Sequence, residues 1–120
     1  MVWPLVFLVA PMVMHRSTRE VLPKSTTTHL TNWVAREPLL RAGFPLRASS
    51  LVPAVREGLR FGMRHEVLKI HAGHIRGTLR PPAIAVSERD VLLKSAGLVG
   101  RWLSKVENPS TAFALLGVAV

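Results

Sequence analysis

Three arginines spaced four residues apart form the pattern in this sequence that points most directly to chemistry. Arg56, Arg60 and Arg64 fall in a segment with helical periodicity, so they share one face of the expected helix. A guanidinium group binds phosphate or carboxylate through paired hydrogen bonds. The stripe therefore predicts a surface for nucleic acid or for an acidic protein, and a helix face that contacts only solvent is the third interpretation.

A second basic group is expected on a short β-hairpin. Residues 67–71 and 74–78 flank a turn at Ala72-Gly73, which sets Ile70 opposite Ile75 on the inner side. Because side chains alternate along a strand, four basic or titratable residues share the outer side: Lys69, His71, His74 and Arg76. Together with the arginine stripe, this side predicts a nucleic-acid interface in which the helix follows phosphates and the hairpin reaches a neighbouring groove.

The same residues give little support for catalysis or for a metal site. His71 and His74 have no nearby carboxylate or cysteine to complete a metal site. His15 and Ser17 lack the glycine-rich elbow and oriented carboxylate of a nucleophile and its base. The seven carboxylates are scattered, and the sequence contains no phosphate-binding loop or dinucleotide fingerprint. We predict a protein that is not an enzyme and binds no metal or cofactor.

Length and composition limit the classes of protein to which the chain can belong. Its 120 residues include sixteen Lys and Arg, seven Asp and Glu and no Cys, which gives a formal net charge of +9. This length predicts one globular domain over residues 1–120, without disulfides or a thiolate zinc site. Since 48% of the residues are hydrophobic, a chain this short is expected to keep apolar surface for a partner.

The apolar N-terminal run resembles a signal peptide but lacks its features. No Lys or Arg precedes it, Pro4 and Pro11 interrupt it, and residues 1–14 fall short of the roughly 20 needed to span a bilayer. Residues 5–14 are expected to form a buried strand or a short helix, because periodicity does not separate the two. The protein is therefore predicted to be cytoplasmic, without membrane contact.

Start and stop signals divide the rest of the chain into helices. Trp3, Trp33 and Trp102 lie in apolar periodic runs and are expected in the core. Gly58 and Gly62 lie four residues apart, so another backbone is expected to approach there. Three helices or turns are expected before the hairpin. They are a turn capped by Ser17, a helix capped by residues 25–28 and ending near Glu37, and a helix capped by Ser49 or Ser50 with Pro53 in its first turn. After the hairpin we expect a helix over residues 87–106 and an apolar turn over residues 112–116 capped by Ser110-Thr111. The core stripe of the third of these helices is expected to be Leu51, Val55, Leu59 and Met63.

The order of these elements predicts the fold class. Helices come first, the hairpin follows, Pro81-Pro82 forms a connector, and a long helix leads to the C-terminus. We expect an α+β domain, mainly α, that resembles a small winged helix with a short β-hairpin and a C-terminal helix. Such a module predicts a stand-alone DNA-binding regulator whose phosphate contacts come from Arg56, Arg60, Arg64, Lys69 and Arg76.

Four motifs follow one another along the chain and suggest a family. They are residues 7–23 with Thr18-Arg19-Glu20, residues 51–62, residues 97–103 with Gly100-Arg101-Trp102, and the closing Leu115-Leu116-Gly117-Val118. In this order they resemble the small middle components of bacterial three-component ABC systems, which are similar to the Lamassu anti-phage systems. Thr18, Arg19, Glu20, Arg101 and Trp102 are the residues that match the family motifs.

The resemblance implies a function different from that of a regulator. It implies a non-enzymatic accessory or adaptor subunit that links an SMC-like ABC ATPase to an effector in an anti-phage defence system. The predicted partners are the ATPase and the effector, with DNA as a further one. Members of the family usually carry a segment before the apolar run, so we expect this domain to lack an N-terminal element of the family. The adaptor is the preferred interpretation, and the winged-helix regulator is the alternative.

Overall fold

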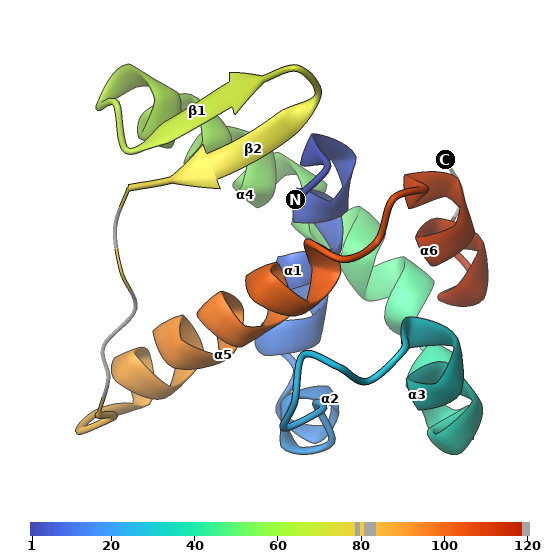
Figure 1. Ribbon diagram of the computed structural model, residues 1–120. Helices are drawn as coiled ribbons and strands as arrows, with labels where there is room; N and C mark the ends of the chain where they lie inside the picture. Colours follow the sequence, from blue (N-terminus) through green and yellow to red (C-terminus); the bar gives the residue numbers. More distant parts are fainter. Residues whose placement is uncertain (79, 81–83, 119–120) are drawn as a thin grey trace.

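The computed structural model describes residues 1–78, 80 and 84–118. These residues form an α+β domain that is mainly α, as predicted, with one antiparallel hairpin (Figure 1). The connector expected at Pro81-Pro82 lies outside the described residues. In chain order the elements are η1 (Trp3–Leu5), α1 (Val6–Val13), α2 (Arg16–Glu20), α3 (Leu30–Arg36), η2 (Pro38–Arg41), α4 (Phe44–Arg64), β1 (Leu68–His71), β2 (His74–Gly77), α5 (Glu88–Leu103) and α6 (Pro109–Leu115).

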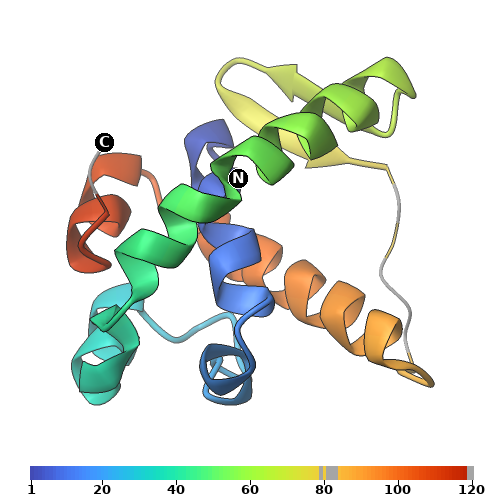
Figure 2. The same cartoon turned by 180° about the vertical axis from the view of Figure 1, so that it is seen from behind.

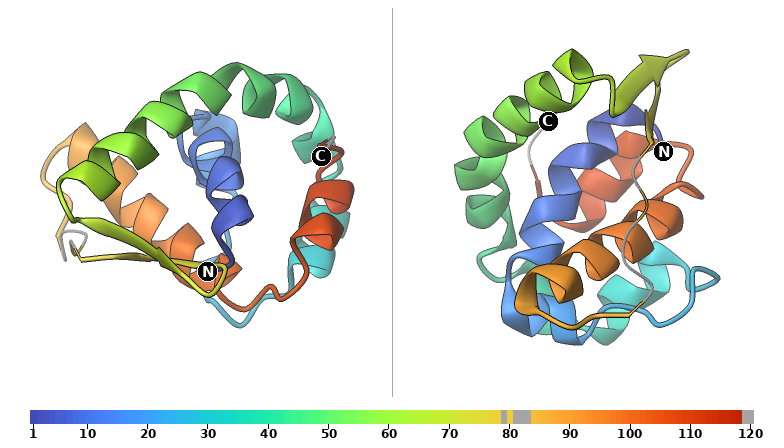
Figure 3. Two further views of the ribbon diagram at one scale, coloured as in Figure 1. Left: turned by 90° about the horizontal axis from the view of Figure 1, so that it is seen from above. Right: turned by 90° about the vertical axis from the view of Figure 1, so that its left-hand side faces the viewer.

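Helix α1 lies at the centre of the molecule, with α4, α5, α6 and the hairpin around it (Figure 3, left). All eight of its residues are apolar, and Leu8, Met12 and Val13 are buried. A helix that is hydrophobic on every side is stable only when other elements cover it. The sequence did not decide whether this apolar run forms a strand or a helix, and the structure shows that it forms the central helix. Within the described residues, no helix combines the length and the apolar character needed to cross a membrane.

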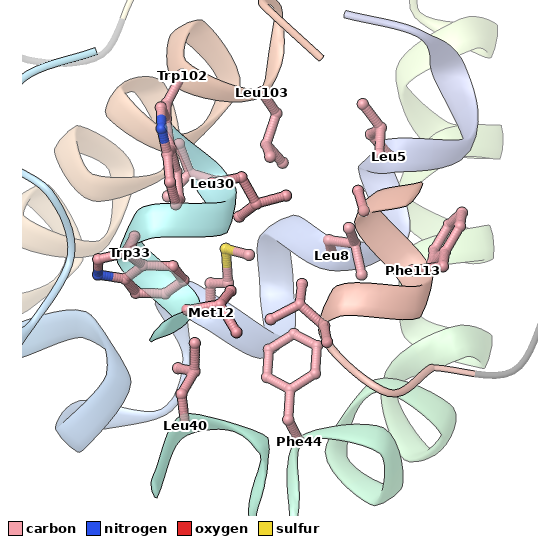
Figure 4. Packing of buried hydrophobic residues seen from close by; sticks show 14 of the residues in the cluster. Leu5, Leu8, Met12, Leu30, Trp33, Leu40, Phe44, Trp102, Leu103 and Phe113 are labelled. Atoms are coloured by element: carbon pink, nitrogen blue, oxygen red, sulfur yellow. The ribbon is translucent and has the colours of Figure 1, made fainter. Parts of the chain in front are cut away.

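Two tryptophans join the helices at one end of the core. Trp33 on α3 and Trp102 on α5 are both buried, next to Met12 of α1 (Figure 4). The indole N–H of Trp33 donates to the Val21 carbonyl at 2.7 Å, and that of Trp102 donates to the Thr28 carbonyl at 2.6 Å. These bonds fix the segment between α2 and α3 against the core. The predicted core position of both residues is confirmed, whereas that of Trp3 is wrong, because its side chain is 40% exposed.

Helix α4 begins earlier than the sequence analysis predicts. Gly43 precedes it in the left-handed region with φ of 71°, and Pro45 lies in its first turn. A proline fits there because the first amides of a helix have no intrahelical acceptor. The helix therefore starts at Phe44 without a serine cap, and Ser49, Ser50 and Pro53 all lie inside it.

The predicted core stripe of α4 is correct only in part. Leu59 is buried, and Leu51 and Val55 are half-buried, but Met63 is 43% exposed. The N-terminal half of the helix supplies Phe44 and Ala48 to the core instead. The C-terminal half of α4 extends past α1 to the hairpin (Figure 2), which leaves one side of it open to solvent.

The hairpin has the predicted register. Ile70 pairs with Ile75, Lys69 with Arg76, and His71 with His74. Both turn residues, Ala72 and Gly73, have positive φ, at 51° and 78°, as the type I′ turn of a two-residue hairpin requires. Ile75 on the inner side is buried.

The N-terminal residues pair with the free edge of β2, which the sequence analysis did not predict. The amide of Ile75 donates to the Met1 carbonyl at 2.8 Å, and the amide of Trp3 donates to the Gly73 carbonyl at 2.9 Å. A covered edge no longer offers backbone groups to other chains. The pairing also attaches the hairpin to the start of η1, so the hairpin has a defined place on the molecule.

The helix caps agree with the prediction at α5 and differ from it at α2. The Ser87 hydroxyl accepts from the Asp90 amide at 3.2 Å, as expected for the cap of α5. The N-cap of α2 is His15, whose Nδ1 accepts from the Thr18 amide, so the prediction of Ser17 is wrong. Three other helix limits differ from the expected ones. The N-cap of α3 is His29 instead of a residue in 25–28, and that of α6 is Asn108 instead of Ser110 or Thr111. Helix α5 ends at Leu103 instead of near residue 106.

Candidate interaction surfaces

The three arginines of the predicted stripe lie on the exposed side of α4. Arg56, Arg60 and Arg64 are all exposed. Arg60 forms an ion pair with Glu57, and both side chains are more than half exposed. An exposed pair of this kind contributes little to stability and leaves the guanidinium free to exchange partners. The stripe is therefore able to bind phosphate or carboxylate groups of another molecule.

The structure does not join this stripe and the hairpin into one surface. The side of α4 that meets the hairpin carries Gly62, where a Cβ atom would overlap with the Leu68 side chain. Residues two apart on an α-helix are rotated by about 200° around its axis. Arg60 and Arg64 flank Gly62 at this spacing, so they point away from the hairpin. The expected single interface of helix stripe and hairpin is thus divided between two sides of the molecule.

The outer side of the hairpin gathers cationic and titratable groups, as predicted. Lys69 and Arg76 are cross-strand neighbours, and His71 and His74 form the next pair. All four are exposed, and they line a hollow of about 810 Å³ together with Thr78. Amines, guanidinium groups and imidazoles on a shared surface attract anions. Within the described residues, no cluster of three or more potential metal ligands occurs.

The motif residue Thr18 joins the start of α2 to α4. Its side chain is buried, and its hydroxyl lies 2.8 Å from His15 Nδ1. Arg47 of α4 donates to the same hydroxyl at 3.4 Å and packs over the Phe44 ring, 5.6 Å from its centroid. Burial lowers the pKa of the Arg47 guanidinium. Sequence reasoning missed Arg47, because its spacing from Phe44 is informative only if the helix begins at Phe44.

Arg19 and Glu20 of the same motif have different surroundings. Arg19 donates to the Val13 carbonyl at 2.8 Å and so joins α2 to the end of α1. Glu20 forms an exposed ion pair with Arg16, at 3.1 Å. The carbonyl that Arg19 satisfies belongs to the last turn of α1, where helix geometry leaves such groups without an intrahelical donor. Arg19 therefore stabilises the α1–α2 corner, whereas Glu20 remains accessible.

The motif Gly100-Arg101-Trp102 divides between core and surface. Trp102 is buried against Trp33, whereas Arg101, the preceding residue, is exposed on α5. Adjacent residues of a helix point about 100° apart, so one can belong to the core and the other to the surface. Trp102 thus has a structural role, and Arg101 is the member of this motif that another molecule can reach.

An apolar groove that the sequence analysis did not locate opens between α1, α4 and α5. Its volume is about 330 Å³, and all twelve residues that line it are apolar. Met14 and Leu93 at its edges are 58% and 43% exposed. The excess of apolar residues in the composition was the signal for such a surface, but only the packing of three separate helices gives its position.

Comparison with known proteins decides the family. A family model described as ABC-three component (ABC-3C) system Middle Component 3 matches residues 1–120. The chain belongs to this family. Membership implies that this ABC-3C middle component works with the other components of its system. Neither a curated protein nor a solved structure matches the chain, so the winged-helix part of the fold prediction stays a prediction.

Proposed function

We propose that this ABC-3C middle component is a non-enzymatic adaptor that links the SMC-like ABC ATPase of its system to an effector in anti-phage defence. The observation that carries the proposal is the separation of its surfaces. The arginine stripe of α4 and the basic side of the hairpin point in different directions from one small core, and the apolar groove opens at a third place. A subunit with separate surfaces is able to contact two partners at once.

The distribution of the carboxylates supports a binding role over catalysis. General acid–base chemistry needs ionisable groups that converge on a site shielded from water. Five cavities within the described residues are lined by apolar, basic and neutral polar side chains. Glu20 and Glu57 form exposed ion pairs, and Asp90 accepts from the Val86 amide before α5. Because the ATPase partner uses ATP, we expect the complex to act in the cytoplasm.

A bridging experiment tests the adaptor. The ATPase and the effector encoded with this chain are co-expressed with and without it, and a tag on the ATPase is used for purification. We expect the effector to co-purify with the ATPase only when the middle component is present. Co-purification of the two in its absence, or failure of the middle component to bind either of them, would contradict the proposal.

The hairpin supports a second candidate function, direct contact with DNA. Lys69, Arg76 and the two histidines lie around one hollow on the outer side of the hairpin. The formal net charge of +9 adds long-range attraction to any polyanion. This function is compatible with the adaptor, because a middle component that contacts DNA through its hairpin still has α4 and the groove for proteins.

A further inference from the structure

The apolar groove between α1, α4 and α5 has no covering element among the described residues. Helices α4 and α5 both pack against α1 and diverge from one another, so that α1 is visible between them (Figure 3, right). Val9 and Ala10 of α1 line the groove, with Val55 of α4 and Leu92 of α5. Apolar surface of this kind is costly to leave in water. The groove is therefore a surface that another molecule would stabilise by covering.

Gly58 indicates what shape of molecule the groove accepts. A glycine inside a helix lowers helix stability, so its presence needs a reason. Gly62 has one, because the Leu68 side chain occupies the place of its missing Cβ. Gly58 has no atom within 4 Å of that place, although it lines the groove. Small residues also face it from the neighbouring helices, at Ala10 and Ala96. This leaves room for the close approach of a helix backbone.

The charge beside the groove indicates which helix fits. Arg89 of α5 is exposed and lies three and four residues before Leu92 and Leu93, so it shares their side of the helix. Glu57, the one carboxylate of α4, is paired with Arg60. On α5, Glu88 and Asp90 lie about 100° to either side of Arg89, and Asp90 accepts from the Val86 amide. With a formal net charge of +9, the chain favours a partner that carries carboxylates.

We infer that the groove binds an amphipathic helix of a partner protein, with its apolar side on α1 and acidic residues toward Arg89. The inference rests on the proposed adaptor function and assigns one of its contacts. Helices bind to grooves between helices through apolar residues at i, i+3, i+4 and i+7, and charges at the rim select among candidate helices. The partner helix is expected in the ATPase or in the effector of the same system.

Substitutions at Gly58 test the inference without disturbing the fold. Gly58→Leu fills the groove, and Gly58→Ala adds only a methyl group. Both raise the helix propensity of α4, so both variants should melt at or above the Tm of the wild type. We expect Gly58→Leu to weaken binding to one purified partner component at least tenfold, and Gly58→Ala to change it less than threefold. Equal binding by Gly58→Leu and wild type would overturn the inference.

Crosslinking within the assembled complex identifies the occupant. A photoreactive amino acid replaces Leu93 at the rim of the groove, and the control carries it at the exposed Ser50 of α4. We expect the Leu93 probe to label an amphipathic helix with flanking Asp or Glu in a partner component. Labelling of a second copy of this chain, or of a segment without carboxylates, would overturn the inference. If the wild type assembles and Gly58→Leu assembles equally well, only the groove inference fails; if the wild type binds neither component, the adaptor function fails with it.

Discussion

The indole rings of Trp33 and Trp102 meet edge to face, with their centroids 4.9 Å apart and their planes at 90° (Figure 4). This arrangement is the favoured one for aromatic pairs, since the positive edge of one ring meets the negative face of the other. Both indole N–H groups donate to backbone carbonyls, so neither polar group is buried without a partner. The pair therefore joins α3, α5 and the segment before α3 into one unit.

We predict that Trp102→Phe destabilises the protein by about 2 kcal/mol, measured by urea unfolding. The substitution keeps an aromatic ring but removes buried volume and leaves the Thr28 carbonyl without its donor. Arg101→Ala is the matched control, because Arg101 is the exposed neighbour and an exposed substitution of this kind changes stability by less than about 0.5 kcal/mol. A similar loss in both variants would contradict the structural role of Trp102.

The cap of α2 gives a second prediction. His15, and not Ser17, accepts the hydrogen bond of the Thr18 amide. We expect His15→Ala to lower the free energy of unfolding by about 1 kcal/mol, the usual cost of a lost N-cap, because the Thr18 amide loses its acceptor. The Thr18 hydroxyl then keeps only its contact with Arg47. Ser17→Ala should change it by less than about 0.5 kcal/mol. A larger loss of stability in Ser17→Ala than in His15→Ala would show that Ser17 is the cap.

The sequence predicted elements whose signals are local. The turn at Ala72-Gly73 determines the hairpin register, and Ser87 with Asp90 marks the start of α5. The sequence could not decide whether residues 6–13 form a helix or a strand, because a segment that is apolar throughout shows neither helical nor strand periodicity. It also did not give the start of α4, because Ser49 or Ser50 followed by Pro53 has the pattern of a helix start, although the helix begins at Phe44.

The features of the candidate surfaces that the sequence missed depend on tertiary packing. The separation of the arginine stripe from the hairpin follows from the contact of Gly62 with Leu68. The apolar groove exists because α4 and α5 both pack on α1, and the covered edge of β2 depends on the backbone of Met1 and Trp3. None of these contacts is local in sequence, so a pattern of residue types does not reveal them.

The hairpin turn gives a prediction with opposite signs at two neighbouring positions. Ala72 has φ of 51°, in the left-handed region that a Cβ atom disfavours by roughly 1 kcal/mol. We expect Ala72→Gly to relieve this cost and raise the Tm. The greater conformational freedom of glycine in the unfolded chain offsets part of the gain. Gly73→Ala should lower the Tm, since the φ of Gly73 is 78° and the substitution creates the same strain. Thermal unfolding by circular dichroism measures both, and a loss in both variants would show that the turn has another geometry.

The last prediction separates the two basic surfaces in DNA binding. If DNA contacts the outer side of the hairpin, the double variant Lys69→Gln, Arg76→Gln should bind duplex DNA more weakly at low salt. Each lost phosphate contact reduces the slope of log K against log salt by about 0.9, so the slope should fall by roughly 2. The matched control is Arg60→Gln, Arg64→Gln, which removes the same charge from the side of α4 that points away from the hairpin. Fluorescence anisotropy over a salt series measures the slopes. Equal losses in the two double variants would mean that net charge alone drives binding, whereas a loss confined to the control would assign the DNA contact to α4.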